Sequence, residues 1–103
     1  MSRFKISLIL FALLASSSLV HADDKNCEAM AFLAKQIMAG RQAGVPMTKA
    51  IELSKSDNKT LEKISRLFVI AAYEEPAYGT KAMQEKSINE FENKMYLPCI
   101  KEG

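Results

Sequence analysis

Histidine is nearly absent from this chain of 103 residues, in which His21 is the only one. It lies in an N-terminal segment that we expect to be removed, so the mature protein would hold none. Such a chain lacks the usual general base of enzymes and the commonest ligand of transition metals. No phosphate-binding loop, CxxC, HExxH, GxSxG or calcium-loop motif occurs either. We therefore expect no enzymatic activity, no metal site and no cofactor.

The N-terminal segment has the three parts of a secretory signal peptide. Arg3 and Lys5 give it a positive start, residues 6–15 are apolar, and residues 19–22 suit a signal peptidase. The apolar run is shorter than the roughly 20 residues that span a bilayer, which disfavours the alternative of an uncleaved anchor. We expect a signal peptide over residues 1–22 and a periplasmic or secreted domain over residues 23–103, with no stable membrane insertion after cleavage.

An excess of charge is also absent from the expected mature chain. The formal charge of +2 comes from Arg3 and Lys5, and residues 23–103 hold equal numbers of basic and acidic side chains. Without a basic run, the chain lacks the electrostatic footprint of a nucleic-acid-binding protein. It also lacks a polybasic patch for a membrane surface. These absences favour another envelope protein as the partner, and no nucleic acid.

Cysteine occurs only at Cys27 and Cys99, near the two ends of the expected mature chain. An even number of cysteines in a small exported domain favours a disulfide, and two cysteines allow one intramolecular pairing. Two free thiols or an intermolecular bridge are the alternatives. In a domain this small, one bridge could supply most of the net stability.

Alternation typical of strands is absent, and apolar residues recur at helical spacing. The pattern predicts four helices, at residues 25–41, 47–55, 59–75 and 81–96. Gly44 and Pro46 separate the first two, while Pro76 and Pro98 end the third and fourth. Helices in alternating directions would bring the two cysteines to one end. The expected fold is all-α, a small four-helix bundle with one disulfide.

Residues 61–73 are the most apolar part of the expected mature chain. One buried stripe could not cover neighbours such as Leu67 and Ile70 together with Val69, so we expect the other helices to surround this one. Glu62 and Arg66 are spaced for an exposed ion pair. Phe32 is expected to widen the inward face of the first helix. The same inward role is expected of Met30, Met38, Met47, Met83 and Met95.

Two glutamates, Glu74 and Glu75, lie beside Tyr73 and Tyr78 at the end of the third predicted helix. Carboxylates there could form an acid–base pair or a cation site lined by the tyrosines. Adjacent helical residues point about 100° apart, however, and a helix C-terminus disfavours negative charge. A structural ion pair, with Arg41 or Arg66 as the partner, or a solvated turn is therefore the favoured alternative.

Arg41 and Gln42 form the second candidate, at the end of the first predicted helix. Arginine at a helix C-terminus can cap the last carbonyls and interact with the helix dipole. Exposed arginine is also enriched where proteins bind one another. The possible binding surface is therefore Arg41, Gln42, Tyr73, Glu74, Glu75 and Tyr78.

The order of these motifs resembles a group of small secreted proteins of proteobacteria and their prophages. The resemblance rests on Cys27, Arg41-Gln42-x-Gly44-x-Pro46-Met47, Ala72-Tyr73-Glu74-x-Pro76, Phe91 and Cys99. It implies a periplasmic helical domain with one disulfide, and no activity. It also gives weight to the Arg41 and Tyr73 motifs, as a shared surface or as shared structure.

These observations favour a small periplasmic protein-binding module, such as an inhibitor, an immunity-type factor or an accessory protein. The first alternative is a carrier that holds a small ligand near Tyr73, Glu75 and Tyr78. The second is an envelope chaperone that opens when acid neutralises its carboxylates.

Overall fold

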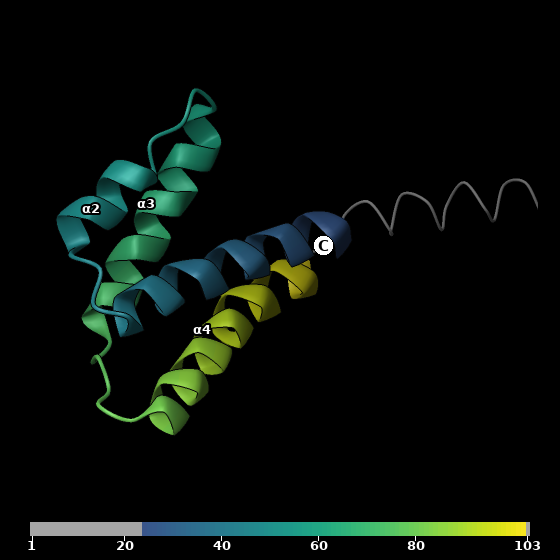
Figure 1. The fold of residues 1–103 in the computed structure, drawn as a ribbon. Helices are drawn as coiled ribbons and strands as arrows, with labels where there is room; N and C mark the ends of the chain where they lie inside the picture. Colours follow the sequence, from purple (N-terminus) through teal and green to yellow (C-terminus); the bar gives the residue numbers. More distant parts are fainter. Residues whose placement is uncertain (1–23, 103) are drawn as a thin grey trace, which may run out of the picture.

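The computed structural model describes residues 24–102, and the predicted signal peptide lies outside the described residues. The described part is all helical (Figure 1). An N-terminal helix covers residues 24–42, and three further helices follow: α2 (Met47–Leu53), α3 (Lys59–Glu74) and α4 (Lys81–Glu102). Residues 24–102 contain no strand. The prediction of an all-α fold with four helices is confirmed.

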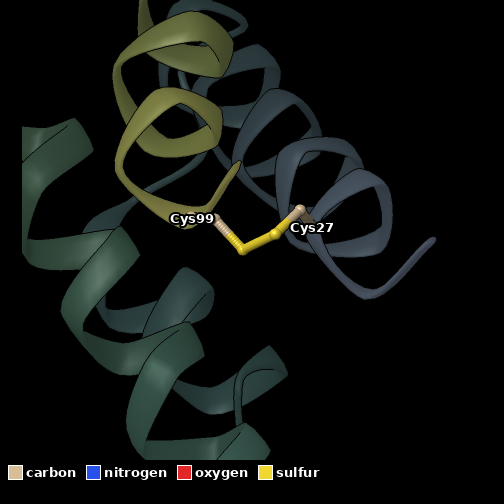
Figure 2. Close-up of a disulfide and its surroundings, with 2 residues drawn as sticks. All are labelled: Cys27 and Cys99. Carbon is tan, nitrogen blue, oxygen red and sulfur yellow. A yellow bond between two sulfur atoms is a disulfide. The ribbon is translucent and has the colours of Figure 1, made fainter. Parts of the chain in front are cut away.

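The N-terminal helix and α4 lie side by side and run in opposite directions (Figure 1). They meet at one end through a disulfide between Cys27 and Cys99, whose Cα atoms are 5.6 Å apart. Figure 2 shows the bond joining the two helices. At the far end, α2 and α3 form a hairpin that packs across the pair. The predicted intramolecular pairing is confirmed, and the direction of the chain explains why the cysteines meet.

The core lies where three helices meet. Ala34 and Met38 of the N-terminal helix pack with Ala72 of α3 and Phe91 of α4, and all four are at most 2% exposed. Two alanines at the centre let the helices approach closely around two larger side chains. Partly buried side chains surround this cluster: Ile37, Phe68, Ala71, Tyr73, Ile88 and Met95.

Helix α3 is less enclosed than its composition predicts. Ser65, Val69 and Ala72 form its buried stripe, whereas Leu67 and Ile70 on the opposite face are 56% and 37% exposed. The expectation that other helices surround α3 is therefore wrong. A chain this small encloses one face of each helix and leaves the rest in contact with solvent.

The expected inward faces also need correction at three positions. Phe32 is 61% exposed, and Met47 and Met83 are 41% and 40% exposed. Phe32 lies away from the buried stripe of its helix. Met47 lies in the first turn of α2, a helix without buried residues, and Met83 lies in the first turn of α4, before that helix reaches the core. Of the other methionines, Met38 is fully buried and Met95 packs against the core.

The N-terminal helix ends in a Schellman motif centred on Gly44. The Val45 N–H donates to the Gly40 carbonyl at 2.9 Å, and the Gly44 N–H donates to the Arg41 carbonyl at 3.2 Å. Gly44 has a φ of 88°, which glycine adopts without the steric cost that a Cβ would bring. The predicted glycine-ended helix is therefore present, and its turn directs the chain into α2.

Side-chain caps open α3 and α4. The Leu61 N–H donates to Asn58 Oδ1 at 3.1 Å, and the Met83 N–H donates to Thr80 Oγ1 at 3.3 Å. Both bonds satisfy donors that the first turn of a helix leaves free. Asn58 is thus the cap among the polar residues that precede α3.

Two helix ends differ from their predicted positions by more than one residue. Helix α2 ends at Leu53, two residues early, where Ser54 Oγ donates to the Ile51 carbonyl at 2.6 Å. Helix α4 continues through Pro98 to Glu102, so Pro98 does not stop it. Proline removes one hydrogen bond from a helix. The disulfide at Cys99 holds the following turn against the N-terminal helix despite that loss.

The predicted ion pair between Glu62 and Arg66 is replaced by other contacts of Glu62. Its Oε2 lies 3.4 Å from Lys59 Nζ, and its Oε1 accepts a hydrogen bond from the Ser56 N–H at 3.1 Å. The turn before α3 offers a free backbone donor, and a charge-assisted bond to it is stronger than an exposed pair. Mainly because of this bond to Ser56, the pKa of Glu62 is lowered from its usual value.

Candidate functional site

Gln42 is a buried polar residue whose side chain bonds to several parts of the fold. It lies in the last turn of the N-terminal helix and is only 6% exposed. Its Nε2 donates to the Pro76 carbonyl at 2.9 Å and lies 3.3 Å from Ser87 Oγ, while its Oε1 accepts from the Tyr78 N–H at 2.8 Å. One side chain thereby connects the N-terminal helix, the loop between α3 and α4, and α4.

Arg41, the residue before Gln42, binds the same loop between α3 and α4. Its Nε and one terminal nitrogen donate to the backbone carbonyl of Glu75, at 3.1 and 3.0 Å. The guanidinium carbon also lies 5.1 Å from the ring centre of Tyr73, within cation–π range. The Tyr73 hydroxyl in turn donates to the Val45 carbonyl. Arg41 therefore satisfies a carbonyl at the C-terminus of α3.

The Glu75 carboxylate has a different partner from the one predicted. Lys94 Nζ of α4 lies 3.8 Å from Glu75 Oε1, and Arg41 contacts only the Glu75 backbone. Adjacent Glu74 is exposed. Hydrogen bonds to the loop also come from Gln84, whose Nε2 donates to the Tyr78 carbonyl at 2.8 Å. The two glutamates do not converge on one atom, as the helical geometry predicts.

Five of the six candidate residues thus come together: Arg41, Gln42, Tyr73, Glu75 and Tyr78. They meet through bonds to backbone groups more than 25 positions away in sequence. Such bonds fix the loop between α3 and α4, which accounts for these residue types without a ligand. In residues 24–102, His, Cys, Asp and Glu side chains nowhere form a group of three that could hold a metal ion.

A small cleft adjoins this network on the α4 side. It has a volume of about 140 Å³ and is lined by Met38, Glu75, Tyr78, Ser87, Glu90, Phe91 and Lys94. Its rim is polar, and Lys94 already pairs with Glu75 inside it. The cleft volume suits a molecule no larger than a benzene ring, and the Glu75–Lys94 pair already occupies part of its charged lining.

A larger apolar groove lies on the other side, between the N-terminal helix, α2 and α3. Its volume is about 240 Å³. Leu33, Ile37, Val45, Ala50, Leu53, Val69 and Tyr73 give it an apolar lining, and Gln36, Gly40, Ser54 and Ser65 complete it. Leu53 is 70% exposed at its edge. The sequence analysis missed this groove, because Leu53 lies off the inward face of α2 and had no assigned role.

A basic pocket adjoins the apolar groove, and Ser54 lines both. The pocket measures about 300 Å³ between α2 and α3. Its charged lining consists of Lys55, Lys59, Lys63, Arg66 and the single carboxylate of Glu62. Four cations against one anion give a positive local potential, although the basic and acidic side chains of residues 23–103 are equal in number. Lys55, Lys59 and Lys63 recur every four positions with acidic and uncharged residues between them, so they form no continuous basic run in the sequence.

Tyr73 should give the fold a sensitivity to alkaline pH. Burial raises the pKa of the Tyr73 phenol, and the nearby Arg41 offsets part of that rise. A raised folded-state pKa means that the unfolded chain loses this proton first, so stability falls as pH rises from the ordinary tyrosine value towards that of Tyr73. We expect Tyr73→Phe to remove this dependence of stability on pH. The variant should also lack one phenol that ionises above the ordinary tyrosine pKa.

Urea unfolding across alkaline pH, together with tyrosinate absorbance, measures both effects. Tyr96→Phe, at another of the three tyrosines, is the matched control. Equal pH dependence in the wild type and in Tyr73→Phe would contradict the assignment.

No protein family, curated protein or solved structure matches this chain. The resemblance to small secreted proteobacterial proteins therefore stays a prediction. Among residues 24–102, no helix combines the length and the apolar character that crossing a membrane requires.

Proposed function

We propose that this chain is a small exported protein-binding module that takes an apolar segment of a partner protein into the groove beside α2. The exposed Leu53 at the edge of that groove carries the proposal. A leucine that is 70% exposed beside an apolar concavity gains from a partner that covers both. The disulfide supports export, because such bonds persist in oxidising compartments.

The adjoining basic pocket indicates the chemistry of that partner. A segment with apolar side chains in the groove and acidic side chains over Lys55 and Lys59 would match both surfaces. An amphipathic helix with one acidic edge meets this description. We propose another envelope protein as its source, in the periplasm or outside the cell.

A second candidate function is the transport of a small apolar ligand. The groove volume of about 240 Å³ is of the size that a small molecule would fill. Native mass spectrometry of freshly purified protein distinguishes the two functions. A carrier would show a discrete added mass, and a protein-binding module would not.

Photo-cross-linking from the edge of the groove tests protein binding directly. Benzoylphenylalanine at Leu53 should capture one envelope protein, whereas the same group at Phe32 should not, although Phe32 is similarly exposed. Leu53→Glu should weaken binding about 30-fold, which corresponds to losing roughly 2 kcal/mol from one buried leucine. Equal capture from both positions, or full binding by Leu53→Glu, would contradict the proposal.

A further inference from the structure

Four exposed residues run along the outward face of α3, and we call them the outer stripe: Lys63, Leu67, Ile70 and Glu74. Their spacing of four, three and four positions places them on one helix face, opposite the buried residues Ser65, Val69 and Ala72. Figure 1 shows α3 at the edge of the fold. Leu67 and Ile70 are therefore adjacent apolar side chains without a covering element among residues 24–102.

The outer stripe has a symmetric order along the helix. Lys63 lies four positions before Leu67, and Glu74 lies four positions after Ile70. A cation and an anion therefore flank the apolar pair at equal distances along the helix. A two-fold axis through the midpoint of the pair would place Lys63 opposite Glu74 of a second chain. The same axis would place Leu67 opposite Ile70 of that chain.

We propose that the occupant of the outer stripe is a second copy of this chain, with the two α3 helices antiparallel. The interface is isologous, since each copy presents the same face. Its centre holds four apolar side chains, and an ion pair lies at each end. The sign of the charges selects the direction: parallel helices would bring Lys63 against Lys63 and Glu74 against Glu74, which repel.

The chemistry of the stripe also limits the affinity. Two half-exposed apolar residues on each copy cover less surface than a permanent dimer uses, and exposed ion pairs add little. The dimer is therefore weak and depends on protein concentration. It leaves the apolar groove open, because the groove is lined by the inward residues Ser65, Val69 and Tyr73 of α3. Lys63 is the one residue that the outer stripe shares with the lining of the basic pocket.

Sedimentation velocity of the disulfide-bonded protein, from low micromolar to millimolar concentration, tests this proposal. The wild type should pass from monomer to dimer, and Leu67→Asp should remain monomeric. Lys63→Glu or Glu74→Lys alone should raise the dissociation constant about tenfold, since each change places two pairs of like charges together. The double variant carrying both changes restores opposite charges and should regain the affinity of the wild type.

Leu53→Glu is the matched control, because it adds a charge at an exposed leucine outside the stripe and should leave dimerisation unchanged. Its behaviour separates this proposal from the proposed function, which that variant would impair. A wild type that stays monomeric throughout would overturn the dimer. A double variant no better than the single variants would overturn the antiparallel pairing.

Discussion

Replacing Cys27 and Cys99 together by alanine is expected to lower the free energy of unfolding by about 4 kcal/mol. The bond joins residues separated by 72 positions, so it closes almost the whole described chain into one loop. Without the bond, the unfolded chain gains far more conformational entropy than the folded chain does. For a domain of this size, that change removes much of the stability. Urea unfolding of the wild type and of the double variant measures it.

Two further measurements distinguish the effect of losing the cross-link from the effect of the small cavity that alanine leaves at buried Cys27. The urea m-value should rise in the variant, because an uncrosslinked chain exposes more surface when it unfolds. A thiol reductant should destabilise the wild type to the level of the variant and leave the variant unchanged. A variant that matches the wild type in both midpoint and m-value would contradict the expected contribution of the bond.

The disulfide and the helices were predictable because each depends on short-range or compositional signals. Gly44, Asn58 and Thr80 mark helix ends through bonds that span at most five positions. Two cysteines leave one intramolecular pairing. The predicted helix end at Pro98 was wrong because a long-range contact acts there. The disulfide, a long-range constraint, outweighs the local cost of proline in the helix.

Burial was less predictable, because the sequence does not give the angle at which helices cross. Helix α3 has apolar residues on nearly all sides, yet only the face with Val69 and Ala72 meets its neighbours. Leu53 and Phe32 are exposed for the same geometric reason. The groove at Leu53 and the outer stripe of α3 are consequences of that arrangement, so the sequence pattern alone did not reveal them.

The candidate site was predicted as a set of residues, while its bonds were not. Arg41 and Glu75 were expected to pair through their charges, and Arg41 instead binds the Glu75 carbonyl. Gln42 was predicted only as the neighbour of Arg41 at a helix end, and it is buried. Sequence reasoning pairs side chains by charge more readily than it pairs them with distant backbone groups. Most of the hydrogen bonds in this network are of the second kind.

Gln42→Leu is expected to lower the free energy of unfolding by about 3 kcal/mol. Leucine is similar in size but cannot pair with the Pro76 carbonyl or the Tyr78 N–H, which Gln42 binds at 2.9 and 2.8 Å. Each buried backbone group left without a partner costs roughly 1–3 kcal/mol. Urea unfolding measures the loss, and hydrogen exchange at the Tyr78 amide should accelerate because that bond is gone.

Gln84→Leu is the matched control, since Gln84 donates one hydrogen bond to the carbonyl of Tyr78 in the same loop. Gln84 is only half-buried, so water can replace its bond, and we expect a loss of about 1 kcal/mol. Equal losses in the two variants would mean that Gln42 is no more important than a loop contact. A larger loss in Gln42→Leu would support the role of this buried amide in joining the N-terminal helix, the loop and α4.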